Sequence, residues 1–151
     1  MSNHFIRNLF FRAARLCGFR QLSWNLQYES GLWDCPERSP NTLSRVLDMC
    51  NGGKLAEFGC GKGEILRHIP SHAYSEYIGF DISDKAIAVA QVTATRSGFR
   101  NAAFYQMDMA RWPGDSGIQL ILVEECLHYL NRVEQEPFLE KCCQSLTPTG
   151  E

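Results

Sequence analysis

Four short apolar runs, each followed by turn-forming or acidic residues, occur after the first third of the chain, at 55–58, 77–80, 103–107 and 118–123. The first and last of these runs have the pattern of strands buried on both faces of a parallel sheet. The segments between these runs have apolar residues at helical spacing. The alternation predicts an α/β fold with a mostly parallel sheet and helices on both of its faces.

The predicted helices cover 42–50, about 65–69, about 84–95 and 133–146. Asn51-Gly52-Gly53 is a stop signal for the first, Ser83 is a candidate N-cap of the third, and Pro137 falls in the first turn of the last. The positions expected to face the sheet are Leu43, Val46, Leu47, Ile65, Leu66, Ile69, Ala86, Ile87, Ala90, Phe138, Leu139, Cys142 and Leu146.

Size and composition predict one ordinary domain. The chain has 151 residues, of which 44% are hydrophobic and 21% charged, and no segment approaches the length of a bilayer-spanning helix. A formal charge of −2 argues against a protein that mainly neutralises nucleic-acid phosphate. The seven cysteines lack zinc or redox spacing, so no metal site is predicted, and a reduced, cytoplasmic chain fits best.

Three alternating glycines, Gly59, Gly61 and Gly63, follow the first predicted strand. Glycines allow positive φ angles and let a ligand approach the backbone. Glu57 precedes them near the strand's carboxyl end, where open α/β sheets bind ligands. A carboxylate there repels a pyrophosphate and suits a cation, which disfavours an NAD-dependent oxidoreductase. A glycine-rich loop without a ligand is the alternative reading.

This stretch resembles the first motif of the class I S-adenosylmethionine-dependent methyltransferases, an acid followed by x-Gly-x-Gly-x-Gly. The resemblance implies a Rossmann-like fold with the first four strands in the order 3-2-1-4. The resemblance also implies that S-adenosylmethionine is the cofactor. The methionine and ribose portions of this cofactor would be held by Glu57, Gly59, Cys60, Gly61 and Gly63.

Two further acids end predicted strands. Asp81, in Gly-x-Asp-x-Ser, is placed to accept hydrogen bonds from ribose hydroxyls, and it matches the family's second motif together with Ile82. The resemblance assigns adenine contacts to Asp108 and Met109, with Trp112 in a loop that could lie against the ring. Turn or helix capping is the alternative role for both aspartates.

The segment 124–130 follows the fourth strand, where the reactive methyl group would lie. It resembles the family's fourth motif in enzymes that act on small molecules, including the nodulation-type N-methyltransferases. Glu124 is then a cofactor contact and Tyr129 a substrate contact. A base is needed only if the acceptor must lose a proton. His128 is the candidate base, and Glu125 is expected either to orient it or to hold a cationic amine. A structural histidine is the alternative.

Residues 1–50 are predicted to form a helical leader, and 51–151 the cofactor domain. Tyr28 and Trp33 resemble lid residues of small-molecule methyltransferases, with plain core packing as the alternative. The stretch 5–19 alternates arginines with apolar residues, which is typical of a transit peptide, a membrane-surface helix or an ordinary packed helix.

The last residues, 146–150, resemble the turn before the family's fifth strand, so we expect a fragment that could self-associate through an uncovered sheet edge. Two function classes follow. One is a methyltransferase that acts on nitrogen or oxygen of a small-molecule acceptor. The other is a truncated, non-catalytic domain that retains only the nucleoside pocket.

Overall fold

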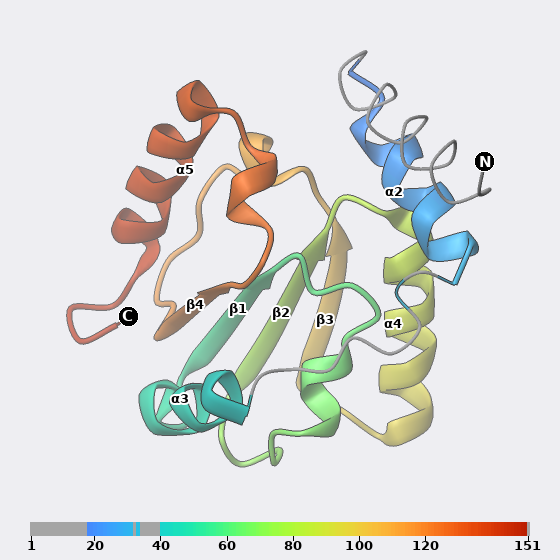
Figure 1. Ribbon diagram of the computed structural model, residues 1–151. Helices are drawn as coiled ribbons and strands as arrows, with labels where there is room; N and C mark the ends of the chain where they lie inside the picture. Colours follow the sequence, from blue (N-terminus) through green and yellow to red (C-terminus); the bar gives the residue numbers. More distant parts are fainter. Residues whose placement is uncertain (1–17, 32, 34–39, 151) are drawn as a thin grey trace.

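A four-stranded parallel sheet forms the centre of the molecule (Figure 1). The computed structural model describes residues 18–31, 33 and 40–150. Its strands are β1 (Lys54–Phe58), β2 (Glu76–Asp81), β3 (Ala102–Gln106) and β4 (Leu120–Val123), in the order β3-β2-β1-β4. The predicted Rossmann-like fold and strand order are therefore confirmed. The stretch 5–19 lies almost wholly outside the described residues.

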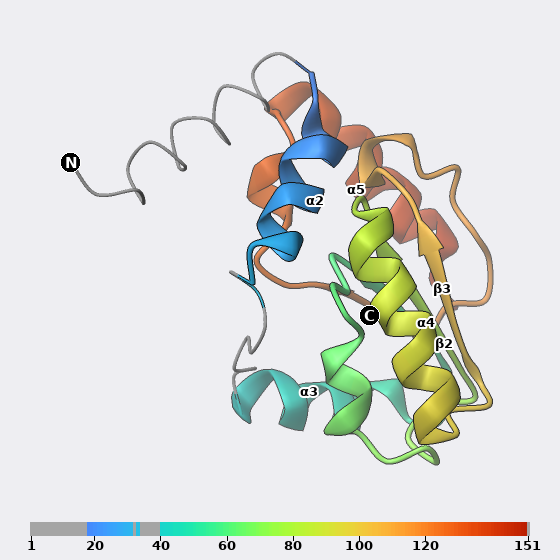
Figure 2. The same ribbon diagram turned by 90° about the vertical axis from the view of Figure 1, so that its right-hand side faces the viewer.

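Helices cover both faces of the sheet (Figures 1 and 2). One core contains side chains of α3 (Pro40–Cys50) and α4 (Asp84–Ser97), and the second contains side chains of α5 (Arg132–Ser145). Successive residues of β1 alternate between them, since Leu55 belongs to the first core and Ala56 to the second. A further helix, α2 (Arg20–Glu29), lies near the carboxyl ends of β2 and β3.

The strand register brings the chemically interesting segments to one edge. Phe58, the last residue of β1, pairs with Phe80 of β2 and with Val123 of β4. Asp81 pairs with Gln106 at the end of β3. The glycine turn and the residues after β2, β3 and β4 therefore meet at the carboxyl edge, where open α/β sheets bind ligands.

Two helices begin with strong caps. Ser83 Oγ accepts a hydrogen bond from Ala86 N–H at 3.1 Å, as its predicted N-cap role requires. Asn131 and Glu134 form a reciprocal capping box at the start of α5. Pro137 lies inside that helix and not in its first turn as expected, since α5 begins at Arg132 and its first turn ends before Pro137.

Other expectations need correction. The predicted helix at 65–69 is only a short 3-10 helix, η1 (Glu64–Arg67), because Gly63 before it is left-handed and Pro70 disfavours helical backbone just before it. Leu47 and Leu139 are 40% and 44% exposed, so neither faces the sheet. Trp112 is 2% exposed and packs edge-on against Phe58, so it is a core residue rather than an adenine contact.

Candidate functional site

A cavity of about 270 Å³ lies at the carboxyl edge of the sheet, beneath α2. Segments from the ends of all four strands contribute to its wall, as does α2 itself. The wall includes most of the residues that the sequence singled out, namely Tyr28, Trp33, Gly59, Cys60, Gly61, Asp81, Ile82, Asp108, Met109, Glu124, Glu125 and Tyr129.

The glycine turn brings bare backbone to the cavity. Gly59 and Gly61 have φ angles of 73° and 55°, which ordinary residues rarely adopt. Their turn is tied to β2, since Gly59 N–H donates to Phe80 O at 2.8 Å. A side chain on Gly61 would bring a Cβ within 3.0 Å of the Tyr28 hydroxyl. Glycine is thus required here for close approach as well as for conformation.

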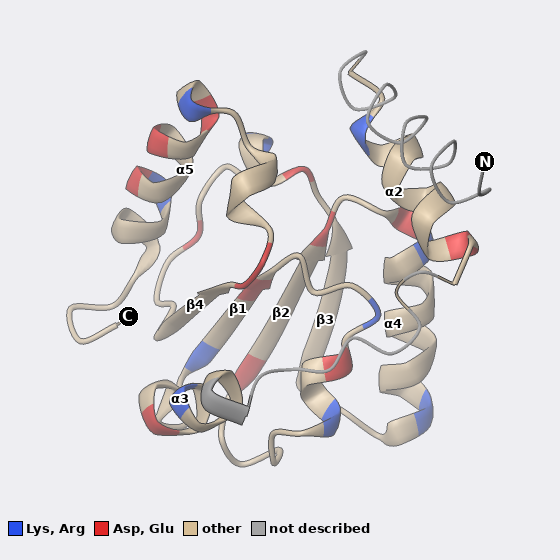
Figure 3. Ribbon diagram, viewed as in Figure 1, with Lys and Arg blue, Asp and Glu red and all other residues tan. Residues whose placement is uncertain are grey.

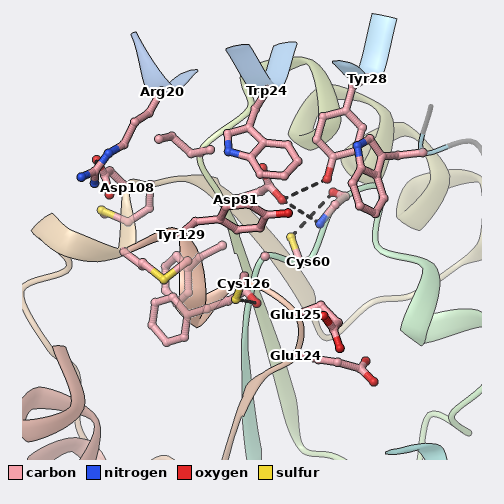
Figure 4. Close-up of a pocket in the computed structure, with 18 of the residues that line it drawn as sticks. Arg20, Trp24, Tyr28, Cys60, Asp81, Asp108, Glu124, Glu125, Cys126 and Tyr129 are labelled. Carbon is pink, nitrogen blue, oxygen red and sulfur yellow. Dashed lines mark hydrogen bonds and ion pairs between the residues drawn. The ribbon is translucent and has the colours of Figure 1, made fainter. Parts of the chain in front are cut away.

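Asp81 is the most heavily engaged acid of the wall (Figure 4). It is 6% exposed, and its carboxylate accepts hydrogen bonds from Gly61 N–H at 3.0 Å and Ser83 N–H at 2.8 Å. The Tyr28 hydroxyl donates to it at 3.3 Å. Burial raises the pKa of Asp81, and these hydrogen bonds oppose that rise. The carboxylate is therefore preorganised to accept hydrogen bonds.

Asp108 follows β3 and caps the short 3-10 helix η2 (Met109–Arg111), where it accepts from Ala110 N–H at 3.0 Å. The predicted capping role and the pocket position therefore coexist. Arg20 Nη1 of α2 lies 3.8 Å from the Asp108 carboxylate. The acid at the end of β3 is thus partly neutralised by the covering helix.

The segment after β4 supplies a second pair of acids. Glu124 accepts a hydrogen bond from Thr42 Oγ1 at 2.6 Å, which joins it to α3. Glu125 is a left-handed non-glycine residue with φ 54°. Cys126 Sγ then donates to Phe58 O at 3.1 Å, and Tyr129 lies in the 3-10 helix η3 (Leu127–Tyr129). Both acids reach the wall of the cavity.

An aromatic group closes the cavity from the side of α2. The Trp24 ring centroid lies 4.8 Å from that of Tyr129 and 5.9 Å from that of Trp33. The sequence reading missed Arg20 and Trp24 as site residues. Their four-residue spacing with Tyr28 was the available signal, because residues at i, i+4 and i+8 share one face of a helix.

Three predicted site residues are not among the wall residues. Glu57 is 1% exposed and accepts a hydrogen bond from the Tyr77 hydroxyl at 2.5 Å, because its position in β1 points it into the first core. Gly63 is the left-handed residue before η1 and packs against Phe104. His128 is exposed, and its ring is tilted relative to that of Tyr129, with the ring centroids 4.0 Å apart.

The wall of the cavity is acidic. Its ionisable carboxyl groups outnumber its basic groups by five to two, a formal difference of −3. The acids are Glu64, Asp81, Asp108, Glu124 and Glu125, and the bases are Arg20 and Lys62. Figure 3 shows acidic residues in red near the carboxyl ends of the strands. Such a wall favours a ligand with positive charge.

Neither a metal centre nor a membrane helix is found in the described part of the chain. Its His, Cys, Asp and Glu side chains form no group of three or more suited to hold a metal ion. Its helices are likewise too short or too polar to cross a bilayer.

Comparison with known proteins identifies this architecture. Residues 55–150 match the family model described as "Methyltransferase domain". Among similar solved structures is the N-methyltransferase NodS from Bradyrhizobium japonicum in complex with S-adenosyl-L-homocysteine. That match has 20% identity and a TM-score of 0.63, and it covers 73% of this chain and 56% of NodS.

Two other solved structures are similar. DhpI, in a complex with SAM and HEP, matches with 23% identity and a TM-score of 0.61, covering 99% of this chain and 64% of DhpI. YcgJ from Bacillus subtilis matches with 20% identity and a TM-score of 0.63, covering 74% of this chain and 48% of YcgJ. The chain thus spans about half to two-thirds of the length of these neighbours.

Proposed function

The chain belongs to the methyltransferase-domain family, and from this premise we propose that it transfers a methyl group from S-adenosylmethionine to nitrogen or oxygen of a small-molecule acceptor. The observation that carries the proposal is the meeting of Asp81, Asp108 and the bare glycine turn in one acidic cavity. Solved neighbours of the same fold, DhpI and NodS, hold SAM and S-adenosylhomocysteine respectively.

The described residues fit such a cofactor. S-adenosylmethionine carries a sulfonium and an ammonium, which suit the excess of carboxyl groups on the wall. The Asp81 carboxylate already accepts a hydroxyl hydrogen bond from Tyr28, so a ribose hydroxyl can take the same kind of bond. Gly59 and Gly61 would leave room for the methionine portion, and Ile82 and Met109 would pack around the adenosine.

Glu57 would take part indirectly. It is held by the Tyr77 hydroxyl behind the glycine turn, so we assign it to the support of that turn rather than to direct cofactor contact. Gly63 has the same supporting role because its missing side chain admits the Phe104 ring.

The bound cofactor supplies an electrophilic methyl group on sulfur. The protein needs to align an acceptor with that group and to exclude water. Aromatic side chains of α2 and of the segment after it would provide the cover, with Tyr28 and Trp33 as lid residues and Tyr129 opposite them. We therefore keep the leader 1–50 as a lid and 51–151 as the cofactor domain. His128 stands outside the wall, which leaves Glu125 as the better-placed candidate base.

Calorimetric titration tests the cofactor assignment. S-adenosylhomocysteine should bind and NAD should not, and Asp81→Ala should weaken binding by about tenfold or more, since a buried hydrogen-bonding carboxylate is removed. Asp48→Asn is the matched control, because Asp48 is an exposed acid of α3. Tight NAD binding without binding of S-adenosylhomocysteine would refute the assignment.

A non-catalytic nucleoside-binding domain is the second candidate. It would use the same wall of Asp81, Asp108 and the glycine turn to bind a nucleoside, without methyl transfer to an acceptor. Methyl transfer from labelled S-adenosylmethionine to a panel of amines and alcohols separates the two candidates. Binding without transfer to any acceptor would favour the second.

The cysteines support a reducing location such as the cytoplasm. Those that the structure describes, Cys50, Cys60, Cys126, Cys142 and Cys143, are all free thiols. Disulfides are rare in such compartments. Self-association through a sheet edge stays a prediction, to be tested by measuring the molecular mass in solution.

A further inference from the structure

Two carboxylates lie apart from the acids proposed to hold the adenosine. In Figure 4, Glu124 and Glu125 lie on the side of the pocket away from Arg20 and Asp108. Glu124 is fixed by its hydrogen bond from Thr42. Glu125 is exposed, and none of the described residues forms an ion pair or hydrogen bond with its carboxylate. Its charge is therefore available to a ligand.

The backbone at Glu125 strengthens this reading. Its φ of 54° lies in the left-handed region, which costs a non-glycine residue about 1–2 kcal/mol. Strain of this kind persists where the surrounding structure holds it, and it is frequent at functional sites. Here Glu125 lies one residue before Cys126, whose thiol donates a hydrogen bond to the Phe58 carbonyl oxygen. The chain thus turns sharply at the acid that reaches the cavity.

Aromatic rings line the same cavity. Trp24 lies at the centre of a group of rings, edge-on to Tyr129 and 5.9 Å from Trp33. The indole N–H of Trp33 is buried and has no acceptor among the described residues. Aromatic faces together with a carboxylate are the features that bind organic ammonium groups. An anion would be repelled by the carboxylate, and a neutral hydroxyl compound would gain neither the charge pairing nor the cation–π attraction.

We infer that the acceptor is an amine that arrives as an ammonium ion, an inference that rests on the proposed methyl transfer. The Glu125 carboxylate pairs with the ammonium and takes its proton, which frees the nitrogen lone pair. That lone pair forms the N–CH₃ bond while the S–CH₃ bond breaks and its electron pair stays on sulfur. Glu125 then releases the proton to water. Trp24 and Tyr129 contact the carbons around the nitrogen.

The three tryptophans allow a direct test. The protein labelled with ¹⁵N is first saturated with S-adenosylhomocysteine, and the three indole N–H signals are then followed during titrations. The probes are tetramethylammonium, tert-butanol and pivalate, which are similar in size and differ in charge. Trp24 and Trp33 report on the cavity, and Trp112, buried in the second core, serves as the internal control.

Tetramethylammonium should shift the Trp24 and Trp33 signals saturably and leave Trp112 in place. Glu125→Gln should weaken its binding by about threefold to fivefold, as expected for an exposed charge pair. Glu125→Asp keeps the charge and tolerates left-handed backbone, so it should restore most of the affinity. Glu140→Gln, the same change on an exposed position of α5, should have no effect.

Equal or stronger saturable shifts with tert-butanol or pivalate would overturn the inference. So would an unchanged tetramethylammonium affinity in Glu125→Gln, or an equal loss in Glu125→Asp. The initial titration keeps the two proposals separate: failure of S-adenosylhomocysteine to bind refutes the proposed function. Binding of the nucleoside without a preference for the cation refutes only the amine acceptor.

Discussion

Arg20 of α2 donates two hydrogen bonds from Nη2 to the Glu134 carboxylate of α5, at 2.8 and 2.7 Å, across 114 positions of sequence. The same carboxylate accepts a hydrogen bond from Asn131 N–H as part of the α5 capping box. One side chain therefore caps α5 and holds the helix that covers the cavity. The position of the aromatic cover depends on this contact.

Arg20→Ala should loosen α2 without unfolding the sheet. A partly exposed, charged pair of this geometry contributes about 0.5–1 kcal/mol, and its loss should raise amide hydrogen exchange in 20–29. Lys85→Ala is the control, because it removes an ion pair between Lys85 of α4 and Glu29 that is about half exposed. If both variants raise exchange in α2 equally, Arg20 has no special role.

The docking of α2 should also depend on pH. The hydrogen bond from Arg20 lowers the pKa of Glu134 below its usual 4.5. A lowered carboxyl pKa means that the contribution to stability is complete above pH 4.5 and is lost as the pH falls through the lowered value. The protection of the amides in 20–29, measured relative to their intrinsic exchange rates at each pH, should thus fall in acid. Glu134→Gln should remove this pH dependence, and a loss of protection that persists in this variant would assign it to another group.

The main features of the fold could be predicted because strand ends have local signatures. Short apolar runs ending in glycine or acid predicted the strands and placed Asp81 and Asp108 at strand ends, while the strand order followed from the family resemblance. The role of Glu57 could not be read in this way. Successive side chains of a strand point to opposite faces of the sheet, and this alternation places Glu57 in the first core. The partner of Glu57 in that core, Tyr77, is 20 positions away in the chain.

The residues of α2 that cover the cavity could likewise be predicted only in part from the sequence. Tyr28 was identified by resemblance, while Arg20 and Trp24 become site residues only when α2 docks over the sheet. Docking depends on distant contacts, such as those of Asn25 with Ser83 and Asp84 of the α4 cap. No local pattern in the sequence specifies such pairs.

Tyr77→Phe tests the supporting role of Glu57. The variant removes one hydrogen bond to a carboxylate that is 1% exposed, so we expect the free energy of unfolding to fall by about 1–3 kcal/mol. Tyr105→Phe is the matched control, because Tyr105 is 53% exposed. Urea denaturation measures both. A loss no larger in Tyr77→Phe than in the control would show that the hydrogen bond contributes little.

Gly63→Ala and Gly52→Ala separate backbone strain from crowding. Both glycines have similar φ angles, 75° and 74°, so alanine carries a comparable backbone cost of about 1–2 kcal/mol at each. A Cβ on Gly52 would meet nothing within 4 Å, whereas one on Gly63 would lie 2.9 Å from the Phe104 ring. Crowding of that buried ring should add about 1–3 kcal/mol to the loss in Gly63→Ala. Urea denaturation of both variants measures the difference, and equal losses would mean that the ring moves aside freely and that only the φ angle requires glycine after the turn.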